Sequence, residues 1–345
     1  MRIATVACVV LVALLASSAR SSTLRVPGGC ATIQGAVDLA TNGDTILVAP
    51  GSYTETAPIV FDTKGNVRLA SEAGRAVTSI DGSIELLNSS KVVVSGFTIN
   101  GRISIICNTG TVIEGCTVTN PGGSGIVVTR CPGGAYSDVE IAGNIIHHNL
   151  TNGVEGDLSG GKAAITGNEI YGNGASGVSI THSYCQISRN LIRDNGADGI
   201  SVSLGTSSVL GNTIVRNAGA GVRFVSSGSP FTETISGDIV SLNGMSGVSG
   251  DAGGVYVVAC CDVWGNGPSA GLDYSGSIAS QTGIGGNISA DPLFCSPSSN
   301  DFSLPASSPA LAQSCGAMGA VTEMVCEGST ATRKTTWGRI RDLYR

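Results

Sequence analysis

The chain has 345 residues and a formal net charge of −6, with 13% charged and 4% aromatic residues. Fifty glycines and a positive mean hydropathy argue against an intrinsically disordered chain and favour a β protein rich in turns. Because it is acidic and has no basic stripe, the chain is also a poor candidate for binding nucleic acid or an anionic membrane.

Residues 1–19 are predicted to be a secretory signal peptide. Arg2 precedes an apolar run at 3–16, and small residues at 17–19 offer a cleavage site. The run is too short to span a membrane, and no later segment is long enough. Cleavage of the signal peptide removes one basic residue, Arg2, and leaves 18 basic against 25 acidic residues, a net charge of −7. We therefore expect a secreted protein, located outside the cell, at its surface or in a periplasm.

Residues 24–54 are predicted to cap the N-terminal end of the domain, which we place at residues 20–326. Thr32 can cap a short helix, because its hydroxyl can accept a hydrogen bond from the first turn. Ile33, Ala36, Val37 and Ala40 share one face of that helix.

A repeat organises the middle of the chain. One set of asparagines is spaced 24, 22 and 22 residues apart and consists of Asn144, Asn168, Asn190 and Asn212. Five residues after each lies a second asparagine, namely Asn149, Asn173, Asn195 and Asn217. A period of this length indicates stacked supersecondary units, each too small to bury a core alone.

Each unit holds three short apolar tracts separated by Gly, Asn, Ser and Asp, which form turns. The tracts follow period two, as in Ile200-Ser201-Val202, where we expect Ile200 and Val202 to point inward and Ser201 outward. Three strands in about 22 residues make one coil, and coils stack at about 4.8 Å in parallel sheets. The sequence therefore predicts an all-β, parallel β-helix solenoid.

The first set of asparagines is predicted to form a structural ladder. Side-chain amides at one position of successive coils can hydrogen-bond to each other and so be buried without losing their partners. Because Asn tolerates the left-handed region, we also expect these residues to adopt that conformation.

This pattern resembles the right-handed parallel β-helix repeat of the pectin-lyase-like superfamily, including NosD-like secreted bacterial proteins. The resemblance covers about residues 24–326 and implies a single-stranded, right-handed β-helix with an N-terminal capping helix. Within it, residues 257–326, with Cys261-Asp262-Val263-Trp264-Gly265-Asn266, resemble the C-terminal closing segment of bacterial relatives. Residues 327–345 are expected to be a linker and a basic tail.

Ten cysteines follow the signal peptide. Cys295, Cys315 and Cys326 are expected to supply one disulfide, with three pairings open, and Cys107, Cys116 and Cys131 could pair across coils. The vicinal pair Cys260-Cys261 is expected to bridge elsewhere or stay reduced. With no Cys-x-x-Cys pattern and only three histidines and four methionines, mostly dispersed, we predict no metal and no cofactor.

The local motifs of enzymes with this fold are missing from the chain. We find no Asp-Pro-His-Glu of alginate epimerases, no Gly-His-Gly set of polygalacturonases and no Arg-x-Pro-x-x-Arg of pectate lyases. The sequence therefore favours a non-catalytic protein that binds a polysaccharide or a cell-surface glycan, and we expect a monomer. The alternative is a lyase or glycoside hydrolase whose active site is not recognised.

One surface strip is the candidate glycan contact. Three residues past successive ladder asparagines lie His147, Tyr171 and Arg193, which the repeat brings into one column that we expect to be exposed. The adjoining positions hold His148, Asp194 and Arg216. Imidazole, phenol and guanidinium groups could hydrogen-bond and stack against a sugar chain, although a solvated polar face explains the same residues.

Overall fold

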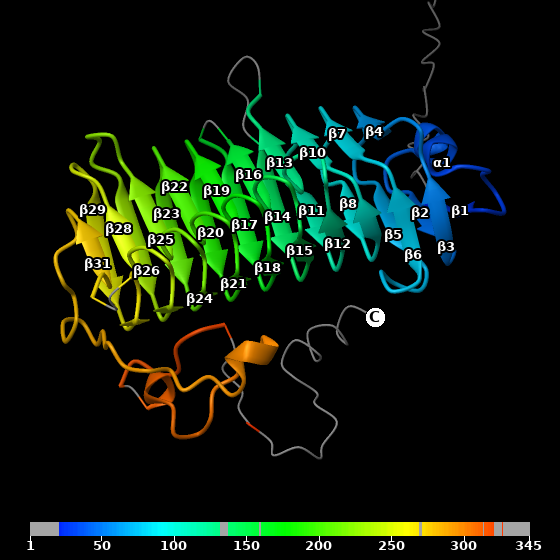
Figure 1. Cartoon of the computed structure of the whole chain (residues 1–345). Helices are drawn as coiled ribbons and strands as arrows, with labels where there is room; N and C mark the ends of the chain where they lie inside the picture. The colour runs from blue at the N-terminus through cyan, green and yellow to red at the C-terminus, as the bar shows by residue number, and fades with distance from the viewer. Residues whose placement is uncertain are drawn as a thin grey trace, which may run out of the picture.

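The computed structural model describes residues 21–131, 137–158, 160–268, 271–312, 314–320 and 326. The predicted signal peptide and the tail at 327–345 lie outside these residues. The described part forms a parallel β-solenoid of three sheets with one short α-helix, so the predicted fold class is confirmed (Figure 1). None of its helices is long and apolar enough to cross a membrane.

Sheet 1 has eleven strands, all paired in parallel. In spatial order its strands are β1 (Thr23–Val26), β2 (Thr45–Val48), β5 (Arg68–Ser71), β8 (Val93–Ser95), β11 (Thr111–Glu114), β14 (Asp138–Ala142), β17 (Lys162–Thr166), β20 (Tyr184–Ser188), β23 (Thr206–Leu210), β26 (Thr232–Ser236) and β29 (Val255–Ala259).

Sheet 2 has ten strands and forms the second wall of the solenoid. These strands are β4 (Ile59–Asp62), β7 (Ile84–Leu87), β10 (Ile103–Ile106), β13 (Ile126–Thr129), β16 (Val154–Asp157), β19 (Val178–Thr181), β22 (Ile200–Ser203), β25 (Val222–Val225), β28 (Val248–Gly250) and β31 (Tyr274–Gly276).

Sheet 3, also of ten strands, is the third wall. Its members are β3 (Gly51–Thr54), β6 (Thr78–Asp81), β9 (Thr98–Asn100), β12 (Thr117–Thr119), β15 (Ile145–His147), β18 (Glu169–Tyr171), β21 (Leu191–Arg193), β24 (Thr213–Val215), β27 (Ile239–Ser241) and β30 (Asp262–Trp264). From β2 onward every third strand along the chain pairs in the same sheet, as one strand of each sheet per coil requires, whereas β1 pairs with the next strand, β2.

The core is a continuous apolar column between the three walls. Ile200 and Val202 are fully buried while Ser201 between them is not, as the alternation predicted. At the N-terminal end lies α1 (Ile33–Leu39), whose Ile33, Ala36 and Val37 are buried. The Thr32 hydroxyl accepts a hydrogen bond from the Gly35 amide (3.0 Å) and so caps this helix.

The asparagine ladder is present and completely buried. The side-chain nitrogen of each residue donates to Oδ1 of the next, at 3.0 Å from Asn144, 2.9 Å from Asn168 and 3.0 Å from Asn190. The expectation of a left-handed backbone at these asparagines is wrong. Positive φ occurs one position earlier, at Gly143, Gly167, Arg189 and Gly211, where the chain turns into the ladder residue.

After β31 the chain folds back along sheet 3, beneath β24 and β21 in Figure 1. Its described residues 288–312 and 314–320, which lie within the predicted 257–326 and are called the closing segment from here on, include two short 3₁₀ helices, Pro297–Ser299 and Pro309–Leu311. Cys260–Cys315 attaches it covalently to the solenoid, Cys295–Cys326 joins it to a later residue, and Cys107–Cys131 joins two coils. One disulfide within the cysteine trio was therefore predicted correctly, and Cys260 does bridge elsewhere.

Candidate functional site

The predicted strip forms one column on the outer face of sheet 3. The strand register places His147 beside Tyr171, and Tyr171 beside Arg193. The imidazole of His147 stacks on the Tyr171 ring with centroids 4.9 Å apart, and the Arg193 guanidinium lies 4.0 Å from that ring's centroid. The repeat offset therefore predicted real neighbours.

The two adjacent histidines are also in contact. Nδ1 of His147 and Nδ1 of His148 are 2.7 Å apart, so one imidazole donates its N–H to the other. Burial, and next the neighbouring His148, lower the pKa of His147. The lowered pKa favours the neutral form of His147, and a neutral imidazole has one ring nitrogen that can accept a hydrogen bond.

The expectation that the whole strip is exposed is wrong at Arg193, whose exposed fraction is 7%. Its guanidinium pairs with the carboxylates of Glu169 and Asp194, both at 2.8 Å. Asp194 also pairs with Arg216 at 2.8 Å. The charges of this half of the strip are therefore engaged with each other rather than with solvent.

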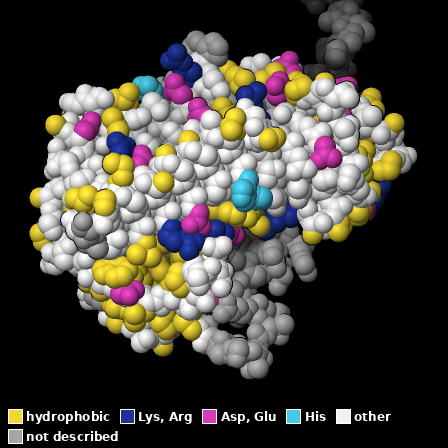
Figure 2. All heavy atoms as spheres, in the orientation of Figure 1, with side chains coloured by type: hydrophobic (Ala, Val, Ile, Leu, Met, Phe, Trp, Pro, Cys, Tyr) yellow, Lys and Arg dark blue, Asp and Glu magenta, His cyan; other side chains and the backbone are white. Residues whose placement is uncertain are grey.

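The closing segment covers that half of the strip. The Arg216 guanidinium donates to the carbonyl of Pro297 and to the side chain of Asn300, and lies 4.8 Å from the Phe302 ring centroid. Leu191 and Val215 are buried against Phe302. These partners are more than 80 residues away in sequence, so the coil period alone could not reveal them. Figure 2 shows a histidine cluster beside basic and acidic side chains, next to a region rich in hydrophobic atoms.

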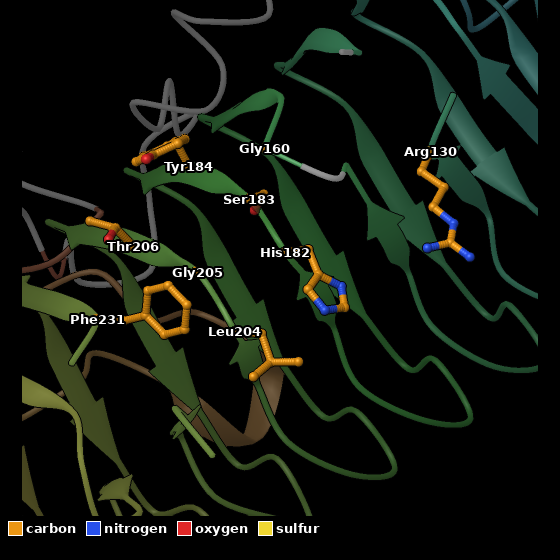
Figure 3. Close-up of a pocket in the computed structure, with 9 residues that line it drawn as sticks. All are labelled: Arg130, Gly160, His182, Ser183, Tyr184, Leu204, Gly205, Thr206 and Phe231. Atoms are coloured by element: carbon orange, nitrogen blue, oxygen red, sulfur yellow. The ribbon is translucent and has the colours of Figure 1, made fainter. Parts of the chain in front are cut away.

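A groove that the sequence did not reveal lies on the outer face of sheet 1. It consists of two cavities of about 530 and 360 Å³ that share Tyr184 and Thr206. The larger cavity extends from β11 to β23, and the smaller one lies at the corner where sheet 2 turns into sheet 1 (Figure 3).

The groove floor is formed by outward side chains of four consecutive coils. The register aligns Asp138, Lys162, Tyr184 and Thr206 in one row, and Glu140 and Gln186 belong to the parallel row two residues on. Tyr184 is 60% exposed, which makes it the only aromatic residue among the exposed large hydrophobic residues that the structure describes. No ion pair involves Lys162 within the same described ranges.

Arg130 and His182 line the corner cavity, and Asp157 contacts both. The Asp157 carboxylate is 3.4 Å from Nδ1 of His182 and 4.0 Å from Nε of Arg130, so it lies between the two. In Figure 3, His182 lies between Arg130 on one side and Leu204 and Phe231 on the other. The Asp157 carboxylate therefore lies within ion-pairing distance of the imidazole, although its Oδ1 makes no hydrogen bond among the described residues.

A sequence signal for the groove did exist. Asp138, Lys162, Tyr184 and Thr206 each lie six residues before a ladder asparagine, so a search of that offset would have placed them in one row. Their concave surroundings could not be read in this way. Across the described ranges no group of three or more His, Cys, Asp or Glu side chains is arranged to hold a metal ion.

Comparisons with known proteins agree with this architecture. Residues 82–240 match the family described as a right-handed beta helix region. The structure of pectate lyase Pel9A is similar, with a TM-score of 0.65 and 14% identity over 87% of this chain and 96% of that one. The A-module of the Azotobacter vinelandii mannuronan C-5 epimerase AlgE6 has a TM-score of 0.42 and 18% identity, covering 75% and 93% of the two chains.

No curated protein sequence matches the chain. The identities to solved structures are low enough that they establish the fold and nothing about the reaction. The repeat, the three parallel sheets and the family match lead to one conclusion: this chain folds as a right-handed parallel β-helix.

Proposed function

We propose that this protein is a secreted, non-catalytic carbohydrate-binding protein, and that an extended polysaccharide lies across the coils in the groove on sheet 1. The observation that carries the proposal is Tyr184. Its ring is exposed at the point where the two cavities meet, in a chain with few aromatic residues. An aromatic side chain offers a large contact area at a low entropic cost, and its face suits the apolar face of a sugar ring.

The surrounding groups suit a sugar chain. Lys162 and Thr206 lie on either side of Tyr184, each about 4.8 Å away along the stack, and can hydrogen-bond to hydroxyl groups. Because these residues lie on strands of a sheet, the contact surface is formed before the ligand binds, which reduces the entropy lost on binding.

Two further observations support the class of ligand and the compartment. The similar pectate lyase is named for action on a polysaccharide, and its fold extends over most of this chain. Three disulfides suit an oxidising compartment, as expected for a protein with a signal peptide.

The strip on sheet 3 is a competing location for the same function. His147, His148 and Tyr171 are accessible, whereas Arg193, Asp194 and Arg216 are engaged with each other and the closing segment. A sugar at the strip would therefore contact the two histidines and Tyr171.

The test is a glycan panel followed by calorimetry with the best-bound polysaccharide. Tyr184→Ala is expected to weaken binding about tenfold, because truncating a central aromatic contact costs on the order of 1.4 kcal/mol or more. Tyr171→Ala is the matched control on the other sheet and is expected to leave affinity unchanged. Circular dichroism must show both variants folded. Weaker binding by Tyr171→Ala alone would move the site to the strip, and unchanged binding by both would reject both sites.

A second candidate function is polysaccharide modification by a lyase or hydrolase reaction. The observation that favours it is the Asp157–His182 contact beside the groove, because a carboxylate close to an imidazole is a common arrangement for proton transfer. Release of new chain ends from a bound polysaccharide, abolished by His182→Asn, would establish catalysis. Binding without new ends supports the non-catalytic function.

A further inference from the structure

The ladder of buried amides continues one coil further with a carboxyl group. After Asn212 the ladder position is held by Asp238, which is fully buried. Its Oδ1 accepts hydrogen bonds from the backbone N–H of Asn212 (2.6 Å) and from the Asn212 side chain (2.8 Å). Oδ1 of Asp238 therefore accepts the same two hydrogen bonds from the preceding coil as Oδ1 of a ladder asparagine.

The other oxygen of Asp238 occupies the place of an amide donor. The side-chain nitrogen of each ladder asparagine also donates to a backbone carbonyl in the preceding coil. That carbonyl belongs to the residue three positions before the ladder residue of that preceding coil. These bonds run from Asn168 to Ile141, from Asn190 to Ile165 and from Asn212 to Ile187, each at 2.8 Å. By the same offset Asp238 faces the carbonyl of Val209. Oδ2 is buried and has no hydrogen-bond partner among the described residues, and an ionised Oδ2 could only repel a carbonyl oxygen.

We propose that Asp238 is a neutral carboxylic acid in the folded protein, with its proton on Oδ2 completing the ladder, so that the last coils loosen when this proton is lost. A protonated carboxyl has one acceptor and one donor, which is the pattern that an amide presents at this position. The ladder thus continues through Asp238 only while the proton is bound.

The groups around Asp238 do not stabilise its charge. Within the described ranges no ion pair involves it, and the one titratable neighbour is the buried thiol of Cys261 in the next coil, whose own pKa burial raises. The backbone and side chain of Asn212 and the Ser236 backbone are its hydrogen-bonding neighbours. Burial raises the pKa of Asp238 to about 7, in line with the geometry.

Loss of the proton would act on the closing segment. The Gly319 amide donates to the carbonyl of Gly237 (2.7 Å), directly beside Asp238, and the Ala320 amide donates to the Thr213 hydroxyl (3.0 Å). Ile239, the next residue, is buried against Leu304, Ala310 and Met318 of the same segment. A displaced Asp238 would therefore weaken the contacts that hold the end of the closing segment against the solenoid.

The direction of the pH effect follows from the raised pKa. The folded state holds the proton more tightly than the unfolded state, so this contribution to stability is complete below pH 3.8 and is lost as the pH rises towards 7. The interval is about three pKa units, which corresponds to at most a thousandfold fall in the folding equilibrium constant. Glu233 and Asp262 are also buried with pKa values raised to about 7, so they add to the same trend.

The decisive experiment compares wild type with Asp238→Asn between pH 5 and 8.5, using hydrogen exchange corrected for intrinsic rates. In wild type the amides of Asn212 and Gly319 are expected to lose at least tenfold protection as the pH rises. In Asp238→Asn they should keep it, since the amide supplies its own donor. Asp238→Ala, which restores no donor, should be weakly protected throughout.

An infrared difference spectrum provides a readout on the wild-type protein itself. At pH 5 a protonated carboxyl band that is absent from Asp238→Asn is expected, and it should fade by pH 8.5. If wild-type protection at Asn212 and Gly319 is independent of pH, or if the band is absent, the proposal is wrong. Equal loss of protection in wild type and Asp238→Asn would assign the pH dependence to Glu233 and Asp262 instead.

Discussion

The ladder makes a strong prediction about Asn190, which lies between two asparagines of the same set. Replacing it with Leu removes four hydrogen bonds. Its side-chain nitrogen donates to Ile165 O (2.8 Å) and to Asn212 Oδ1 (3.0 Å), and its Oδ1 accepts from the backbone N–H (2.8 Å) and the side chain (2.9 Å) of Asn168.

The cost is decided by the groups left without partners. The Asn168 N–H is buried and loses its only acceptor in the ladder, and one such orphaned donor costs about 1–3 kcal/mol. The Ile165 carbonyl and the Asn212 side chain lose one partner each but keep others through the sheet and the ladder. We therefore expect Asn190→Leu to lower the free energy of unfolding by about 3 kcal/mol, near the upper limit for one orphaned donor.

Denaturant unfolding followed by circular dichroism measures the loss, and hydrogen exchange at the Asn168 amide locates it. Asn100→Leu is the control, since Asn100 is exposed on sheet 3 and its removal should cost less than about 1 kcal/mol. If Asn190→Leu unfolds within 0.5 kcal/mol of wild type (about the additivity error of such measurements) and the Asn168 amide stays protected, the ladder does not stabilise the fold.

Two further predictions follow from the same coils. Arg189 has φ of 55° at a position that is glycine in the neighbouring coils. Thermal unfolding of Arg189→Gly is therefore expected to show a free energy of unfolding about 0.5–1 kcal/mol higher than wild type, whereas lower stability would show that the arginine side chain matters more than backbone strain. Arg216→Ala should increase hydrogen exchange in residues 293–304, because it removes the contacts to Pro297, Asn300 and Phe302. The control Arg223→Ala, which removes an ion pair with Asp198 away from this segment, should not, and equal exchange in both variants would mean that apolar packing alone holds the segment.

Sequence by itself determined the solenoid and the ladder. Both depend on one spacing, so a period of 22 to 24 residues was enough to place Asn144 beside Asn168 and His147 beside Tyr171. The conformation of the ladder residues was not predicted correctly. The left-handed residue is the one before the asparagine, since that is where the chain leaves sheet 1, and the next strand begins one residue after the asparagine.

Tertiary structure decided which parts of the surface are available. The strip was predicted as exposed because its residues share an offset, but Arg193 is buried against Tyr171, Glu169 and Asp194. Arg216 contacts Pro297 and Asn300, which follow the last coil, and the period of the coils contains no information about such a segment. The concave shape of the groove beside Tyr184 likewise depends on the turns that border sheet 1, which differ from coil to coil. A repeat thus defines neighbours along the stack, whereas burial depends on contacts between residues far apart in sequence.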